Sequence, residues 1–284
     1  MKLPAFEYAC PATLAEAVAL LAGDGDAKVL AGGQSLVPMM AFRVASPSLL
    51  VDLRKLADLR RIEITAAGVT LGAMARWRDI EDDARLKTAH PLLKAAVAEV
   101  AHYQIRNRGT VGGSIAHADP AAEMPGIVVT CDAEIGVVGR AGPRNIRAAD
   151  FFIAPLTTAL APDEIIVEIR LPAWPAGRRW AFKEFARRRG DFAMAGTALF
   201  YDVDSGGKAR DAHVGAIGVG DVPQRLAAAE AEINGRAVDI AVSERAGVAA
   251  SAAVTPQSDI HASAAYRKSL LGTLVERALQ SACA

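Results

Sequence analysis

Apolar residues near the start of the chain first follow a helical spacing and then gather into short runs. The helical spacing extends over 13–22, after a Thr13–Glu16 pair that is typical of a helix start. Two apolar runs at 27–31 and 49–53 predict short buried strands. The pattern therefore predicts a small α/β subdomain over residues 1–56.

The pattern then changes to short alternating segments that continue to residue 174. Helical spacing recurs over 77–86 and 91–101, and Pro91 suits the first turn of the second helix. The segments that favour strands are 62–65, 69–71, 124–131, 134–138, the stretch around 150–152, and 164–171. Prolines and a glycine over 172–177 indicate a linker, so we expect a second subdomain over 57–174.

The last third of the chain groups its strands and helices in a different way. Three strand-like runs come first, at 180–187, 196–203 and 209–219, and their connections suit an antiparallel sheet. Helical segments follow, at 230–234, 241–253 and 267–283. We expect a C-terminal α+β domain over 178–284, and the whole chain to be of the α+β class.

Composition and charge exclude several classes of function. The 284 residues are 52% hydrophobic, and 32 Lys and Arg balance 32 Asp and Glu, which does not favour a nucleic-acid-binding protein. No apolar run approaches the ~20 residues of a membrane span, and the first residues lack the apolar core of a signal peptide. We expect a soluble, cytoplasmic protein without a membrane span.

Cysteine and histidine residues do not occur at metal-ligand spacing. The three cysteines, Cys10, Cys131 and Cys283, are far apart, and none belongs to a Cys-x-x-Cys pair. An iron–sulfur cluster or a structural zinc site needs about four clustered ligands. The five histidines are also dispersed, so we expect no metal centre on this chain.

Two segments with paired glycines, which we expect to be loops, carry the strongest chemical signal. The first glycine segment, residues 31–36, is Ala-Gly-Gly-Gln-Ser-Leu, and the second, residues 106–114, is Arg-Asn-Arg-Gly-Thr-Val-Gly-Gly-Ser. Glycine lets backbone N–H groups approach a phosphate, while Ser35, Thr110 and Ser114 offer hydroxyl donors. Neither segment has P-loop or Rossmann spacing.

Paired glycines also form ordinary turns, as we expect for Gly206-Gly207 between two strand-like runs. Because the two glycine segments share both glycines and hydroxyl side chains, we favour a nucleotide diphosphate held between them.

Ordered motifs along nearly the whole chain resemble one family. They are Pro4 to Tyr8, Ala31 to Leu36, Gln104 to Ser114, Ala116 to Pro120, Arg188 to Ala193, Asp259 to His261, and Tyr266-Arg267. The sequence resembles the FAD-binding medium subunit of molybdenum hydroxylases, which include bacterial carbon monoxide dehydrogenase, quinoline 2-oxidoreductase and nicotine dehydrogenase. The flavin domain of xanthine dehydrogenase is a more distant relative.

The resemblance implies two small N-terminal α/β subdomains that clamp FAD, followed by a C-terminal domain with a three-stranded antiparallel sheet and helices. It assigns the diphosphate and its neighbouring groups to the two glycine segments, His117 and Glu123 to the ribitol and adenosine side, and Phe192 to the isoalloxazine ring. Glu123 stands where relatives often carry aspartate. The implied FAD contacts are Ala31, Gly32, Gly33, Gln34, Ser35, Leu36, Ala101, Thr110, Gly112, Gly113, Ser114, His117, Glu123, Ile166, Lys183 and Phe192.

From residue type alone, several of these have simpler interpretations. His117 could be an ordinary polar loop residue, Lys183 an exposed lysine on a strand, and Phe192 a core residue. Only the resemblance assigns Lys183 and Phe192 to the cofactor.

The resemblance also implies partners. A large subunit would carry the molybdenum cofactor and hydroxylate the substrate, and a small subunit would carry two [2Fe–2S] clusters. The implied assembly is a dimer of such heterotrimers. This chain would pass electrons through FAD to an external acceptor and would have no catalytic residue or metal of its own. The likeness of residues 106–123 to subunits of N-heterocycle hydroxylases favours a heteroaromatic substrate.

Two other functions are consistent with the same residues. One is a self-contained flavoprotein reductase or oxidase with the same FAD-binding fold, which would need its own substrate pocket. The other is an assembly module that has lost its cofactor, which the intact glycine segments argue against. The sequence does not distinguish among dioxygen, a quinone, a cytochrome and NAD⁺ as electron acceptors.

Overall fold

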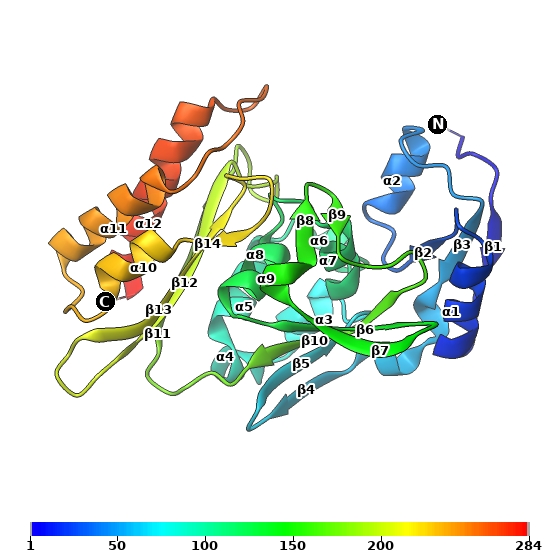
Figure 1. Cartoon of the computed structure of the whole chain (residues 1–284), viewed down its shortest axis with the longest axis horizontal. Coiled ribbons are helices and arrows are strands. Elements are labelled where there is room, and N and C mark those ends of the chain that lie inside the picture. Colours follow the sequence, from blue (N-terminus) through cyan, green and yellow to red (C-terminus); the bar gives the residue numbers. More distant parts are fainter. Residues whose placement is uncertain (1, 283–284) are drawn as a thin grey trace.

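The computed structural model describes residues 2–282 and contains three separate main sheets (Figure 1). In Figure 1 the sheets follow one another along the long axis, from the N-terminal unit through the central sheet to the C-terminal sheet and its helices. The mixture of helices and sheets confirms the predicted α+β class.

The N-terminal unit is built on a three-stranded parallel sheet with the order β1-β3-β2. The predicted capping box is present, because Thr13 and Glu16 exchange hydrogen bonds at the start of α1. The core of this unit also includes Met74 and Ile165, so the unit packs against the central one. Its elements are β1 (Glu7–Ala9), α1 (Leu14–Gly23), β2 (Lys28–Leu30), α2 (Leu36–Ala41) and β3 (Leu49–Asp52), and the 3₁₀ turns η1 (Leu53–Lys55) and η2 (Ala57–Arg60) lead out of it.

The central unit has a five-stranded antiparallel sheet with the order β4-β5-β10-β6-β7. Its strands are β4 (Ile62–Thr65), β5 (Gly68–Gly72), β6 (Glu134–Gly139), β7 (Gly142–Arg147) and β10 (Ile165–Pro172), with a small hairpin of β8 (Phe152–Ala154) and β9 (Thr157–Thr158). Its helices are α3 (Trp77–Asp82), α4 (Leu86–Ala89), α5 (Pro91–Glu99), α6 (Tyr103–Arg106), α7 (Val111–His117), α8 (Glu123–Thr130) and α9 (Ala148–Phe151).

The C-terminal unit places helices on one face of an antiparallel sheet with the order β11-β12-β13-β14 (Figure 1). Its elements are β11 (Arg179–Phe185), β12 (Ala195–Val203), β13 (Ala209–Ile217), β14 (Gln224–Arg225), α10 (Ala227–Ile233), α11 (Ile240–Ala252) and α12 (Ala264–Ala282). The three predicted long strands are confirmed, and the two-residue β14 adds a short edge.

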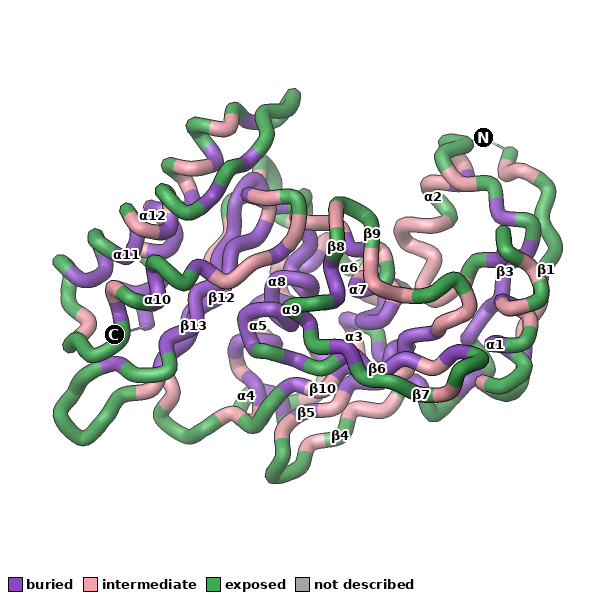
Figure 2. The backbone as a smooth tube through the Cα atoms, in the orientation of Figure 1, coloured by how far each residue is buried: buried purple, intermediate pink, exposed green. Residues whose placement is uncertain are grey.

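The second face of the C-terminal sheet packs against the central unit. Ala198 and Phe200 of β12 belong to the same apolar core as helices α5 and α8. Figure 2 shows that buried positions concentrate in α8, β12 and β13, where the two units meet. This contact determines which face of β11 and β12 lies against the central unit.

Several predictions about secondary structure were wrong. The stretch around 150–152 is divided between helix α9 and strand β8. The run 124–131, predicted to be a strand, forms most of helix α8. The prediction failed because every residue of α8 is buried, so the run lacks the 3.6-residue periodicity of a half-exposed helix. The helix predicted over 77–86 ends at Asp82, and a separate short helix starts at Leu86. The second Gly-Gly pair lies inside α7, not in a loop.

The predicted helix over 267–283 starts earlier, at Ala264, and Cys283 lies outside the described residues. The domain boundary after residue 56 stays a prediction. No described helix is both long enough and apolar enough to cross a membrane.

Candidate functional site

The first glycine segment joins the end of β2 to the start of α2 and leaves backbone donors free. Gly33 has φ of 69°, a conformation that favours glycine. The N–H groups of Gly33, Gln34 and Ser35 donate no hydrogen bond within residues 2–282. The Gln34 side chain donates back to the Gly32 carbonyl oxygen at 3.0 Å, which braces the turn. Three consecutive unpaired donors in this setting suit an anionic ligand.

The two glycine segments are in direct backbone contact. A Cβ atom on Gly32 would overlap the carbonyl oxygen of Arg108 and lie 2.9 Å from the Cα atom of Gly109. On the other side of this contact, a Cβ atom on Gly113 would lie 3.7 Å from Cβ of Ala31. The N-terminal and central units therefore meet at the two segments, as the clamp prediction requires.

The second glycine segment uses its backbone donors within the protein, contrary to the expectation that N–H groups of both segments stay free. The N–H groups of Val111 and Gly112 donate to the carbonyl oxygens of Ala75 and Ala73, at 2.9 and 2.8 Å. The Gly113 N–H donates to the Thr110 hydroxyl oxygen at 3.2 Å, which makes Thr110 the N-cap of α7.

What the second glycine segment can still offer a ligand is its hydroxyl groups. Thr110 accepts the Gly113 N–H through its oxygen and keeps its proton to donate. The Ser114 hydroxyl has no hydrogen-bond partner within residues 2–282, and neither does that of Ser35.

Helix α7 leads from the glycine segments to the second part of the site. Its seven residues extend about 10 Å, from Thr110 at one end to His117 at the other. Ala118 ends the helix with φ of 54°, and the Asp119 carboxylate then accepts the Ala121 N–H at 2.9 Å. This turn delivers the chain to Glu123.

Glu123 is the first residue of α8 and is only 6% exposed. Burial raises the pKa of its carboxyl group to about 7, and the nearby Asp119 and Glu99 also raise it. No other residue in the described chain forms a hydrogen bond with this carboxyl group. A buried acid whose only donor in the described chain is its own backbone N–H fits a site that a ligand completes.

The alternation of β11 separates Lys183 from the other predicted contacts. Trp180 and Phe182 pack against the central core, whereas Ala181 belongs to the core beneath the C-terminal helices. Because strand side chains alternate and the β11–β12 register has no shift, Lys183 lies on the side of Ala181 and Glu184 on the side of Phe182. The contact predicted for Lys183 stays a prediction.

Of the other predicted residues, Ala101 lies beside Gly190, which belongs to the motif 188–193. Ala101 has φ of 43°, and a Cβ atom on Gly190 would lie 2.7 Å from its carbonyl oxygen. Phe192, two residues further on, is 60% exposed. Ile166 is buried in the central core on β10.

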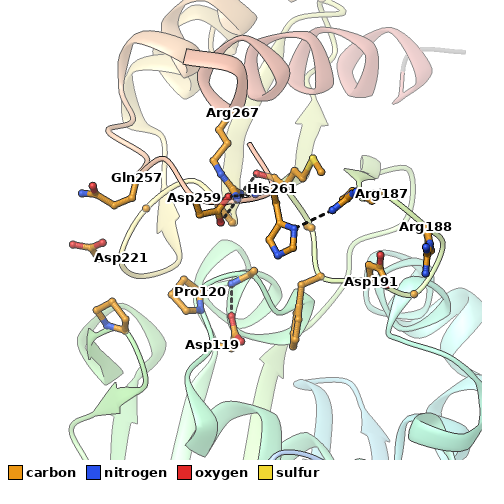
Figure 3. A pocket seen from close by; sticks show the side chains of 18 residues that line it. Asp119, Pro120, Arg187, Arg188, Asp191, Asp221, Gln257, Asp259, His261 and Arg267 are labelled. Carbon is orange, nitrogen blue, oxygen red and sulfur yellow. Dashed lines mark hydrogen bonds and ion pairs between the residues drawn. The ribbon is translucent and has the colours of Figure 1, made fainter. Parts of the chain in front are cut away.

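A cavity of about 710 Å³ opens beside Phe192, between the central and C-terminal units (Figure 3). Asp119 and Pro120 line one side, and the segments around Arg187 and His261 line the other. Arg267 secures the C-terminal wall by donating to the Met194 and Gly218 carbonyl oxygens and to Asp259. Several lining residues belong to the motifs 188–193, 259–261 and 266–267, whereas others, such as Gly218, Asp221 and Gln257, do not.

Sequence reasoning missed Glu184 and the contact between Gly190 and Ala101. The phase of Trp180 and Phe182 could have placed Glu184 on the face toward the central unit, because residues two apart share a strand face. Nothing in the sequence signalled that Gly190 packs on Ala101. Within residues 2–282 there is no cluster of His, Cys, Asp and Glu able to hold a metal ion.

Together, the α+β fold, the paired glycine segments and the cavity beyond α7 define a dinucleotide-binding protein. Two family models match the chain: "FAD binding domain in molybdopterin dehydrogenase" over residues 4–174, and "CO dehydrogenase flavoprotein C-terminal domain" over 180–282. The chain belongs to this family of FAD-binding oxidoreductase subunits.

Similar proteins match over almost their full length. The nicotine 6-hydroxylase medium subunit of Paenarthrobacter nicotinovorans is 39% identical, with 99% of each chain covered. A structure of carbon monoxide dehydrogenase from Hydrogenophaga pseudoflava, which lacks the Mo-pyranopterin moiety of its cofactor, gives a TM-score of 0.96 at 38% identity and covers 100% of this chain and 99% of the other. The structure of quinoline 2-oxidoreductase from Pseudomonas putida 86 gives a TM-score of 0.95 at 38% identity and covers 99% of this chain and 98% of the other.

Proposed function

We propose that this chain is the electron-transfer subunit of a heterotrimeric molybdenum hydroxylase and holds FAD between its two glycine segments. The observation that carries the proposal is the contact between these segments beside three free N–H groups. When bound, FAD accepts electrons one at a time and passes on one or two. The protein residues bind and orient the cofactor.

The N–H groups of Gly33, Gln34 and Ser35 hold the diphosphate in this proposal, and the hydroxyl groups of Thr110 and Ser114 donate to the same group. His117 and Glu123 contact the ribitol and adenosine side, and Phe192 lies by the isoalloxazine ring. The remaining predicted contacts are Ala31, Gly32, Leu36, Ala101, Gly112, Gly113, Ile166 and Lys183. The Gly112 and Gly113 backbones act here through their lack of a side chain, since their N–H groups have protein partners.

The proposed partners are a small subunit with two [2Fe–2S] clusters, which supplies the electrons, and a large subunit with the molybdenum cofactor. Support comes from the relatives, several of which are named medium subunits or medium chains of such dehydrogenases and match this chain end to end. We further propose a cytoplasmic dimer of heterotrimers that passes electrons to an external acceptor.

An N-heteroaromatic compound is the substrate class that we propose for the large subunit. The relatives named for nicotine and quinoline support it, because both names denote nitrogen heterocycles. Assays of the purified complex with nicotine, quinoline and carbon monoxide would separate these choices. Turnover of carbon monoxide alone would contradict the proposed class.

Purification of the tagged full-length chain from its own host tests the proposed function. We expect one FAD per chain, together with iron, molybdenum and two co-purifying subunits. Flavin without iron or molybdenum would instead favour a self-contained flavoprotein. A chain that contains no flavin and takes up none would contradict FAD binding and favour an assembly module.

A further inference from the structure

Glu184 lies on the face of β11 that meets the central unit, where its carboxyl group lacks a partner. Its Oε2 atom is buried and has no hydrogen-bond partner. The opposite residue on β12 is Gly196, whose missing side chain leaves room: a Cβ atom there would lie 3.3 Å from Cβ of Glu184. The same side of Gly196 faces Ile217, which packs on Gly126 of α8.

Glu184 is therefore close to the start of α8, where Glu123 lies. The charges of Glu123 and Glu99 act on Glu184 in addition to its burial, which has the largest effect and raises its pKa to about 8. Glu123 is 6% exposed and has no hydrogen-bond partner outside its own residue in the described chain. The two carboxyl groups thus act on each other. Oε2 of Glu184 has no donor, and the Glu123 carboxyl group has only its own backbone N–H.

Three basic side chains on the surrounding elements bond to other groups or lie on another face. Lys94 of α5 donates to the carbonyl oxygens of Ile80, Glu81 and Asp83. Arg267 of α12 is held by Met194, Gly218 and Asp259, and Lys183 lies on the opposite face of β11. On β12, the residues opposite the end of β11 are Ala195, Gly196 and Thr197, which carry no charge.

The acidic groups that act on the pair are Glu99 at the end of α5 and Asp119 before α8. Two neighbouring buried carboxyl groups do not both ionise readily, because their charges repel and burial disfavours each of them. The pair therefore holds a proton near neutral pH in the absence of a ligand.

We propose that Glu184 and Glu123 together form an acceptor subsite for hydroxyl or N–H donors of bound FAD, and that FAD binding displaces the proton they hold. This inference rests on the proposed function, because it assigns a further part of the same cofactor site. A carboxylate that accepts hydrogen bonds is stabilised in its ionised form, so ligand donors favour release of the proton to solvent. Glu184 adds, from the inner face of β11, a contact to those that the resemblance implies, among which the contact of Lys183 stays a prediction.

Calorimetric titration of the cofactor-free full-length chain with FAD tests this inference. Titrations at pH 7 in two buffers with different ionisation enthalpies give the number of protons exchanged per FAD bound. We expect the wild-type chain to release a proton, in an amount up to one per FAD. The variant Glu184→Gln should release fewer and bind FAD about tenfold more weakly, as for loss of one charge-assisted hydrogen bond.

Two further variants make the test specific. Glu244→Gln removes an exposed carboxylate on α11 and should leave both affinity and proton release unchanged. Glu184→Asp keeps the carboxyl group and should retain proton release, which a merely structural effect of the substitution would not predict. Circular dichroism verifies that each variant is folded.

Unchanged proton release and affinity in Glu184→Gln would overturn this inference and leave FAD binding itself intact. Proton uptake by the wild-type chain, or the absence of any exchange, would also overturn it. Failure of the folded wild-type chain to bind FAD would instead overturn the proposed function, and this inference with it.

Discussion

The two glycine segments have similar residues but offer a ligand different groups. The first follows β2, adopts a positive φ at Gly33 and leaves three consecutive N–H groups unpaired. The second lies at the start of α7, where its N–H groups bond to Ala73, Ala75 and Thr110. We infer that the first segment binds a diphosphate with its backbone, whereas the second binds it with hydroxyl groups.

The glycines themselves therefore have different physical roles. Gly33 supplies a backbone conformation, and Gly32 and Gly112 allow close packing against Arg108 and Ala73. A Gly-Gly pair in a sequence does not tell these roles apart. Substitutions at the two segments can do so, because each role fails in its own way.

The largest effect is expected when the contact between the segments is broken. Gly32→Val would drive a branched side chain into the backbone of Arg108 and Gly109. We expect FAD binding to be lost and the free energy of unfolding to fall by about 3 kcal/mol, since overpacking against backbone forces it to move. Urea denaturation and flavin content measure both effects. A variant with wild-type stability would contradict the contact.

The next largest effect is the pH dependence of stability that Glu123 causes. This residue lies beyond the end of α7 that is far from the glycine segments. The raised pKa of Glu123, about 7, means that the folded chain keeps a proton that the unfolded chain releases near 4.5. Its contribution to stability is present below pH 4.5 and is lost as pH rises through 7. Between pH 5 and pH 7 this loss amounts to about 2 kcal/mol.

Glu123→Gln should remove this loss. Urea denaturation of the cofactor-free chain at pH 5 and pH 7 measures it as the difference between wild type and variant. In a double variant, the effects of Glu123→Gln and Gly33→Ala on the free energy of unfolding should add, because the two sites do not share partners. Equal pH dependence of wild type and variant would show that Glu123 ionises normally.

A smaller effect separates backbone conformation from ligand binding in the first segment. Gly33→Ala and Gly207→Ala both place a Cβ atom on a residue with positive φ, at 69° and 76°. Each should lose about 1 kcal/mol of stability. Only Gly33→Ala should also weaken FAD binding, by tenfold or more, because Gly207 lies in a turn with open space around it. Similar FAD affinities in the two variants would refute backbone binding by this segment.

The smallest effects are expected in the second segment. Ser114→Ala removes a hydroxyl without a protein partner and should weaken FAD binding about fivefold with stability unchanged. Thr110→Ala also removes the N-cap of α7 and should lower stability by about 1 kcal/mol, whereas Thr110→Ser should restore it. Fluorescence titration with FAD and thermal unfolding measure these changes.

Much of the fold could be predicted because most strands and helices have one buried face. Helix α1 and strands β11, β12 and β13 lie close to their predicted ranges. Helix α8 could not be recognised by periodicity, because it is buried on all sides. Its Pro125, in the first turn, was the remaining signal for a helix start.

The site was predictable where a motif carries it, and less so where the tertiary structure assembles it. The glycine segments were found from sequence, but the hydrogen-bond partners of the second, Ala73 and Ala75, lie in the segment after β5, which no motif marks. Glu184 of β11 and Glu123 of α8 act on each other only because α8 packs on the C-terminal sheet, through Ile217 and Gly126. Residue type alone does not reveal such a pair.

Titration of the cofactor-free wild-type chain with FAD, with ADP and AMP as competitors, tests the central claim most directly. A diphosphate held between the two glycine segments predicts saturation at one FAD per chain, with ADP competing well and AMP poorly. FAD binding that is insensitive to ADP would contradict the proposed position of the diphosphate. Absence of saturable FAD binding would contradict the assignment of this chain as the flavin subunit.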